Sequence, residues 1–317
     1  MNTSKENADS VEDKKAIPLR NELFYRIFIS ALFIPILIFI AWTGGIYYLL
    51  LIELGIGVGA YEFFKILESR GLKPYTFLGV IAALILGWSA YFASYMFTFL
   101  TLTMLLLIIS VSELCRKTID RAIYHISATL FGVFYVGWLM SHLTLLRQIP
   151  VFLYYGETMK NLANFKLCYF FPQIVFASGY TKGAIYTLIP FVLAWANDSG
   201  AYFIGHNFGK HKVLKRISPN KSWEGLIGGG ICGLIGIFIL KYSIATELSA
   251  IDCFILGILG ACTAPVGDLV ESLLKRDAQV KDASNTIPGH GGILDRFDSI
   301  LFVAPIVYYY LRFFVVK

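Results

Sequence analysis

The chain has 317 residues, of which 57% are hydrophobic and 15% are charged. Soluble domains have roughly half of their residues apolar and about a quarter charged, so this composition excludes an ordinary soluble protein. In such a chain a net charge of +6 does not indicate binding of nucleic acid. We therefore expect no nucleic acid among the partners. We expect an all-α polytopic membrane protein with about nine transmembrane helices.

The apolar segments follow a polar start. Residues 1–20 are polar and charged and are interpreted as a flexible cytoplasmic tail. A spanning helix needs about 20 mostly apolar residues. Nine later segments approach this length: 27–42, 46–64, 77–91, 95–111, 126–146, 185–204, 226–240, 251–270 and 299–314. The first two are joined by Thr43-Gly44-Gly45, a pattern typical of a tight turn.

These segments suggest three parts after the tail. Residues 21–147 hold about five spans with few charges, only Glu53 and Glu62 lying in or near a span, and are interpreted as a transmembrane scaffold. Residues 148–184 are expected to form a long extracytoplasmic loop, with a re-entrant or interfacial piece at 165–176. Residues 185–317 hold about four spans and most of the polar clusters, so they are the expected catalytic domain.

The basic residues of the loops predict the orientation. With nine spans and a cytoplasmic N-terminus, the inner segments carry 20 Lys and Arg and the outer segments carry 7. Short cytoplasmic loops are enriched in these residues. The bias therefore predicts a cytoplasmic N-terminus and a C-terminus outside.

Two polar clusters surround the expected spans at 185–204 and 226–240. Asn197 and Asp198 lie near the inner end of the first, and a charged residue inside a span costs about 2.5–3.5 kcal/mol, so it usually has a function. The loop before the second contains Lys221 and Ser222, which together with backbone N–H groups suit an anion, and it ends at Glu224. The alternatives are a helix-pairing role for Asp198 and a loop that contacts only lipid headgroups.

A third cluster consists of Asp268, Glu271, Ser272 and Lys275. Their spacing of i, i+3, i+4 and i+7 places them on one helical face. That face is polar where the expected span 251–270 leaves the membrane. The alternative is an ordinary amphipathic helix end with a local Glu271–Lys275 pair.

The fourth cluster is the sequence PGHGG at 288–292, followed by Asp295 and Asp298. The glycines let the backbone approach a ligand closely. In the nine-span arrangement all four clusters reach the cytoplasmic membrane surface. Carboxylates, cations and Gly-rich backbone at one depth indicate Mg²⁺ with phosphates, because Mg²⁺ binds one or two carboxylates plus phosphate oxygens. No zinc motif of the HExxH type occurs.

The segment 272–298 resembles the signature of the phosphatidate cytidylyltransferases, the CDP-diacylglycerol synthases. It contains S-x-hydrophobic-K-R, then four residues, K-D, P-G-H-G-G and D-R-hydrophobic-D, with every specified position filled. The segments 197–202 and 218–225 look like two upstream motifs of the family, and the resemblance is detailed over 185–314. His206 departs from the family, which more often has Arg or Lys there.

The resemblance implies transfer of the CMP group of CTP to phosphatidate with Mg²⁺, beside which family members can carry K⁺. It implies an integral protein of the bacterial-type inner membrane, with its active site at the cytoplasmic face, and it leaves a homodimer open. The implied metal ligands are Asp268 and Asp295, supported by Asp298 and Glu271; the catalytic group comprises Asp268, Asp295, Asp298, Lys275 and Lys281. The implied phosphate-binding residues are Lys221, Ser222, Ser272, Lys275, Arg276, Lys281, His290, Gly291, Gly292 and Arg296, with Asn197, Asp198, Glu224 and Asp282 in supporting roles.

Two other functions remain open from the sequence. A CTP-dependent lipid kinase acting on polyprenol or phytol would transfer the γ-phosphoryl group and release CDP instead of pyrophosphate. An ion-coupled membrane transporter would place its polar groups at mid-membrane in broken helices, whereas here they are expected at one surface.

Overall fold

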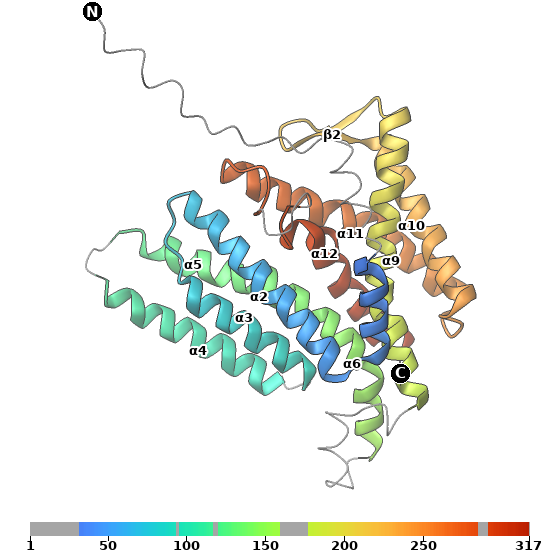
Figure 1. Cartoon of the computed structure of the whole chain (residues 1–317), viewed down its shortest axis with the longest axis horizontal. Helices are drawn as coiled ribbons and strands as arrows, with labels where there is room; N and C mark the ends of the chain where they lie inside the picture. Colours follow the sequence, from blue (N-terminus) through green and yellow to red (C-terminus); the bar gives the residue numbers. More distant parts are fainter. Residues whose placement is uncertain (1–31, 93–94, 117–119, 159–176, 285–290, 317) are drawn as a thin grey trace, which may run out of the picture.

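The computed structural model describes residues 32–92, 95–116, 120–158, 177–284 and 291–316. Within this part the chain is almost entirely helical, and the helices pack side by side in two groups (Figure 1). The first group comprises the helix Leu32–Thr43, α2 (Gly45–Ser69), α3 (Thr76–Tyr91), α4 (Tyr95–Leu114), α5 (Ala122–Gly132), the π-helix η1 (Val133–Trp138) and α6 (Leu139–Thr158). The second group comprises α9 (Ala177–Phe208), α10 (Trp223–Ser243), α11 (Ala250–Asp277), α12 (Leu294–Tyr310) and the π-helix η2 (Leu311–Val315).

Each of the nine expected spans overlaps a helix of the described chain. By length and composition, the helices long and apolar enough to cross a membrane are Met96–Leu114, Ala122–Ile149, Trp223–Ser243, Ala250–Asp277 and Leu294–Val315; Leu32–Thr43 and Thr76–Tyr91 are shorter apolar helices. This confirms a helical integral membrane protein. The expected tight turn is also present, because Gly44 and Gly45 both have a φ of 57°, which glycine adopts without strain.

The expectation of a long loop at 148–184 is wrong at both ends. Helix α6 continues to Thr158 and α9 already begins at Ala177, and the expected re-entrant piece at 165–176 lies outside the described residues. The mixed composition of this stretch, with Pro150, made it look like a loop. A membrane helix tolerates such a proline because its neighbours satisfy the freed backbone groups.

A small β-hairpin, which the sequence pattern did not predict, joins α9 to α10. Strand β1 (Lys212–Leu214) pairs antiparallel with β2 (Ser218–Ser222), with Lys212 opposite Ser222 and Leu214 opposite Ser218. The hairpin lies at one end of the helices (Figure 1). Ser222 ends β2 and caps α10, because its hydroxyl accepts the N–H of Gly225 at 3.2 Å.

The two groups of helices meet through α6, which packs on α9 and α12, and through α2, which contacts α12. Within the second group, α9 and α10 approach closely at small residues. A Cβ at Gly229 would lie 2.6 Å from the carbonyl oxygen of Asn197. Such contacts are typical of packing in membranes, where small residues let backbones come together.

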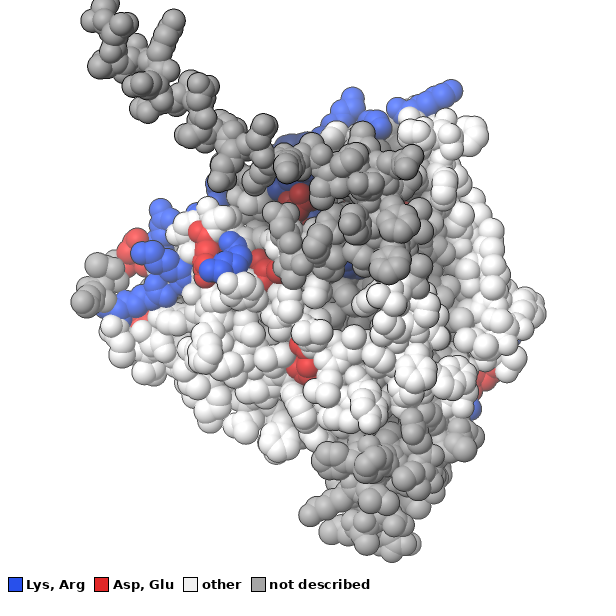
Figure 2. Space-filling view, in the orientation of Figure 1, with Lys and Arg blue, Asp and Glu red and all other residues white. Residues whose placement is uncertain are grey.

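Figure 2 shows how charge is distributed over one face. Lys and Arg gather near one end of the molecule and along one flank, while most of the remaining described surface on this face is uncharged. Many exposed side chains of the described chain are large and apolar, including Phe99, Leu107 and Ile239. An apolar surface of this extent matches a lipid environment.

Candidate active site

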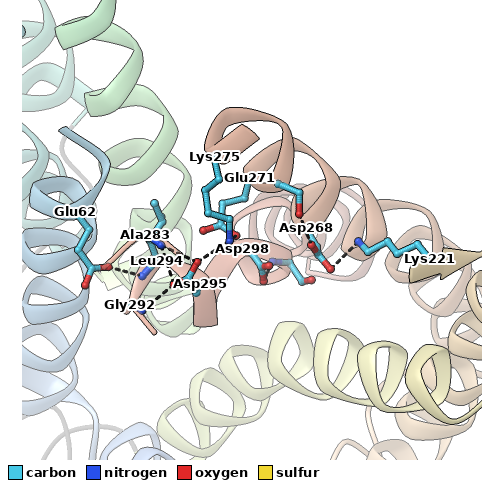
Figure 3. Close-up of polar contacts among 12 residues, drawn as sticks. Glu62, Lys221, Asp268, Glu271, Lys275, Ala283, Gly292, Leu294, Asp295 and Asp298 are labelled. Atoms are coloured by element: carbon cyan, nitrogen blue, oxygen red, sulfur yellow. Dashed lines mark hydrogen bonds and ion pairs between the residues drawn. The ribbon is translucent and has the colours of Figure 1, made fainter. Parts of the chain in front are cut away.

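Charged side chains from four separate elements lie in one cluster, which Lys221 of the hairpin joins (Figure 3). We call the acidic members the carboxylate cluster: Asp198 on α9, Asp268 and Glu271 on α11, and Asp295 and Asp298 on α12. The basic members are Lys221 on β2 and Lys275 on α11.

The polar face of α11 is formed as its spacing predicts. The hydroxyl of Ser272 donates to Asp268 Oδ1 at 3.2 Å, and Lys275 Nζ lies 3.0 Å from Glu271 Oε2. The same Nζ lies 2.6 Å from Asp295 Oδ1. Lys275 therefore does more than stabilise its own helix, because it joins two carboxylates from different helices.

Lys221 brings the hairpin into the cluster. Its Nζ lies 2.6 Å from Asp268 Oδ2, and its side chain is 20% exposed. The neighbouring Ser222 is the helix cap described above, so the two residues have distinct roles. One fixes the start of α10, and the other presents a cation to α11.

Asp295 is held by the backbone of the signature segment as well as by Lys275. The N–H of Gly292 donates to Asp295 Oδ2 at 2.7 Å, and the N–H of Ala283 donates to the same oxygen at 3.1 Å. Gly291 has a φ of +79°, and a Cβ there would lie 2.7 Å from Asp295 Oδ2. Glycine is needed at this position both for the left-handed backbone and for the close approach.

Glu62 is a site residue that the sequence interpretation assigned to the scaffold. It lies on α2, is 2% exposed, and accepts hydrogen bonds from the Ser284 hydroxyl at 2.5 Å and the Leu294 N–H at 2.9 Å. These contacts tie the first group of helices to the segment that holds Asp295 (Figure 3). The signal in the sequence was an acidic side chain at the end of an apolar segment.

Asp298 lies among like charges. Its carboxylate is within electrostatic range of Asp268, Glu271 and Asp198, and it accepts the N–H of Ser299 at 2.6 Å. The hydroxyl of Ser299 donates to Asp198 at 3.5 Å. Several carboxylates this close repel one another, so the arrangement favours a bound cation.

Other expected site residues make different contacts or have exposed side chains. Glu224 accepts the N–H groups of Lys210 and His211, at 3.1 and 3.2 Å, and so braces the base of the hairpin. Asn197 is buried between α9 and α10. Four other expected site residues have exposed side chains: Arg276, Lys281, Asp282 and Arg296. His290 lies outside the described residues.

The donors present suit a hard cation, although they are not gathered around one. In the described part of the chain, no three Asp, Glu, His or Cys side chains are grouped as a ready metal site. Asp268 and Asp295 are instead paired with lysines. All the candidate ligands are oxygens, as Mg²⁺ requires. Glu271 is 1% exposed, and its Oε1 has no hydrogen-bond partner among the described residues, so one buried acceptor is available.

The chain is similar to a group of cytidylyltransferases. Residues 24–314 match the model of the cytidylyltransferase family. The chain is 34% identical over 276 residues to the phosphatidate cytidylyltransferase of Synechocystis sp.. This alignment covers 84% of this chain and 89% of that protein. It is 31% identical over 319 residues to phosphatidate cytidylyltransferase 4, chloroplastic, of Arabidopsis thaliana, covering 96% and 77%. With the phosphatidate cytidylyltransferase of Bacillus subtilis the identity is 44% over 132 residues, covering 42% and 49%.

Proposed function

The chain belongs to the cytidylyltransferase family and is a nucleotidyltransferase, and we propose that it transfers the CMP group of CTP to phosphatidate. An oxygen of the phosphatidate phosphate forms a bond to the α-phosphorus of CTP, the bond from that phosphorus to the β-phosphate oxygen breaks, and pyrophosphate leaves. The product is CDP-diacylglycerol, a precursor in phospholipid biosynthesis. The observation that carries the proposal is the junction at Lys275, which links signature carboxylates from two helices in one cluster.

The main barrier to this reaction is the approach of two anions. The phosphatidate phosphate already carries negative charge, so a strong protein base is not needed. Catalysis of phosphoryl transfer consists mostly of positioning and charge stabilisation. Lys221 and Lys275, which neutralise carboxylates in this structure, are suited to turn toward phosphate oxygens when the substrates bind.

We assign Mg²⁺ to the carboxylate cluster, with Asp268 and Asp295 as principal ligands and Glu271 and Asp298 in support. A bound Mg²⁺ supplies Lewis-acid stabilisation of charge on the phosphates. A K⁺ ion beside it remains part of the proposal. The buried Oε1 of Glu271, which has no partner among the described residues, and the like charges around Asp298 support a cation at this place.

The remaining phosphate-binding assignments rest on the signature. Gly292 presents its backbone N–H beside Asp295, a geometry that suits an anion once the carboxylate binds a cation, and the neighbouring Gly291 is assigned with it. Arg276, Lys281 and Arg296 have exposed side chains in the signature segment, and we assign them to the triphosphate or the lipid phosphate. Ser272, His290, Asn197, Asp198, Glu224 and Asp282 keep the roles that the resemblance implies.

We also propose the nine-span arrangement, with a cytoplasmic N-terminus, an outer C-terminus and an active site facing the cytoplasm of a bacterial-type inner membrane. The hairpin with its lysines adjoins the carboxylate cluster, because Lys221 on β2 pairs with Asp268. This supports a cytoplasmic location because basic loops favour that side. Phosphatidate would then reach the cluster from the inner leaflet.

A product assay with purified protein tests the reaction. The protein in detergent is incubated with Mg²⁺, phosphatidate and CTP labelled in the α-phosphate, and the label is expected in the lipid fraction as CDP-diacylglycerol, with one pyrophosphate released per product. Release of CDP with a phosphorylated polyprenol or phytol would instead identify a lipid kinase. Ion-coupled substrate uptake without CTP consumption would identify a transporter.

A further inference from the structure

Tyr135 carries a buried hydroxyl group whose presence is not explained by the packing of the described residues. The residue lies in the π-helix η1, is 4% exposed, and its hydroxyl has no hydrogen-bond partner among the described residues. Buried polar groups are almost always hydrogen-bonded, and an exception calls for an explanation such as a catalytic role or a bound water. Phenylalanine would fill the same space without this hydroxyl.

The ring of Tyr135 is fixed by aromatic neighbours. Its centroid lies 5.3 Å from that of Phe63, 5.5 Å from Phe131 and 6.3 Å from Phe302. Phe302 follows Asp298 by four residues on α12, which is about one helical turn. The ring therefore packs beside the part of α12 that carries the carboxylate cluster, and single π-turns inside helices often occur at functional sites.

The charged groups that influence the phenol are acidic. Glu271, Asp298 and Asp268 all lie within electrostatic range of the Tyr135 hydroxyl. No hydrogen bond joins it to any of them. Among these carboxylates, Glu271 has a buried oxygen, Oε1, that also lacks a partner among the described residues. A buried donor and a buried acceptor, both without a partner among the described residues, thus lie within electrostatic range of each other, and a water molecule with such polar partners is stably bound.

We propose that Tyr135 is a positioning residue of the carboxylate cluster. Its hydroxyl and Glu271 Oε1 bind one buried water between them, and this water keeps Glu271 oriented toward the cation of the cluster. The inference rests on the metal centre proposed above. It assigns part of the active site to the first group of helices, which the sequence pattern indicates as scaffold. Groups of this kind, one step removed from a metal ligand, typically change metal affinity by about 10- to 100-fold.

The test compares two variants that each lose one buried hydroxyl. Tyr135→Phe removes the proposed positioning group. Tyr48→Phe is the matched control, because Tyr48 is 1% exposed and its hydroxyl donates to the carbonyl oxygen of Leu143 at 3.4 Å. Binding of Mn²⁺, which accepts the same oxygen ligands, is measured by electron paramagnetic resonance on purified protein without substrates. Melting temperatures of the metal-free proteins are measured in parallel.

Tyr135→Phe is expected to raise the dissociation constant for Mn²⁺ about 10-fold or more without lowering the metal-free melting temperature. Tyr48→Phe is expected to leave Mn²⁺ binding unchanged. An unchanged Mn²⁺ affinity in Tyr135→Phe overturns the role of Tyr135, whatever its melting temperature.

Asp295→Asn separates this inference from the proposed metal centre. If Asp295→Asn abolishes Mn²⁺ binding and Tyr135→Phe leaves it unchanged, only the role of Tyr135 fails. If Mn²⁺ binding survives Asp295→Asn, the metal centre itself is wrong and the inference falls with it.

Discussion

Glu62 and Leu294 are 232 positions apart in the chain, yet a carboxylate oxygen of the first accepts the backbone N–H of the second at 2.9 Å. The bond holds the start of α12, and Asp295 is the next residue. The position of a signature carboxylate therefore depends on α2, which carries none of the signature residues.

Replacing Glu62 by Gln tests this dependence. The amide has one acceptor oxygen in place of two, so either Ser284 or Leu294 loses its acceptor in a buried place. We expect a loss of about 1–3 kcal/mol of stability and a fall in CDP-diacylglycerol synthesis of about tenfold or more, since a buried catalytic group is misplaced. Glu68→Gln is the control on the same helix, because Glu68 makes a partly exposed pair with Lys65. Equal activities of the two variants would refute the role of Glu62.

Asp295→Asn removes a charge while keeping the shape of the side chain. We expect CTP turnover to fall by about 100-fold or more, because a metal ion supplies several kcal/mol of charge stabilisation to phosphoryl transfer. The protein should remain folded and inserted, which size-exclusion chromatography in detergent checks. Asp277→Asn is the control, since that side chain is 67% exposed and only 3.6 Å from Arg70 at the surface. Near-normal turnover in Asp295→Asn would exclude it as a ligand.

Lys275→Met tests the cation that joins the two helices. Its removal leaves Glu271 and Asp295 without their shared partner, and breaking a buried pair costs about 3–5 kcal/mol. We expect a lower melting temperature without metal and a larger stabilisation by added Mg²⁺ than in the unmodified protein. Lys65→Met, at an exposed pair, should change neither quantity. A Mg²⁺ effect equal to that of the unmodified protein would show that Lys275 and the cation do not share ligands.

Gly291→Ala can be compared with Gly71→Ala at nearly the same backbone angle. The two glycines have φ values of +79° and +78°, so both substitutions introduce about 1–2 kcal/mol of strain. Only at Gly291 does the new methyl group meet a site atom, Asp295 Oδ2, whereas nothing lies within 4 Å at Gly71. We expect similar stability losses in thermal melts, but a loss of activity in Gly291→Ala alone. Full activity in Gly291→Ala would argue against the tight Asp295 geometry.

Hydropathy predicted where the helices lie because lipid imposes the same requirement on every span. It also predicted the polar face of α11, since i,i+4 neighbours follow from helical geometry alone. The hairpin at 212–222 was not predicted because its strands are short, polar and without alternation. The ends of α6 and α9 were misjudged because polar residues and a proline inside a helix look like a loop.

The roles of Glu62 and Tyr135 could not be predicted from the sequence, for a different reason. Each depends on a contact with residues more than 100 positions away, and no local pattern of charge or periodicity encodes such a pairing. In the sequence, Glu62 is an acid at the end of an apolar segment and Tyr135 is one aromatic residue among many. Only the packing of α2 and η1 against α12 distinguishes them.

The hydrogen bonds of Glu62 also predict whether the second group of helices can function without the first. A fragment starting at residue 177, where α9 begins, would retain all the signature residues but would lose the hydrogen bond from Leu294 to Glu62 that holds the start of α12. We expect such a fragment to be inactive by itself and to regain turnover when the first 176 residues are supplied as a separate polypeptide.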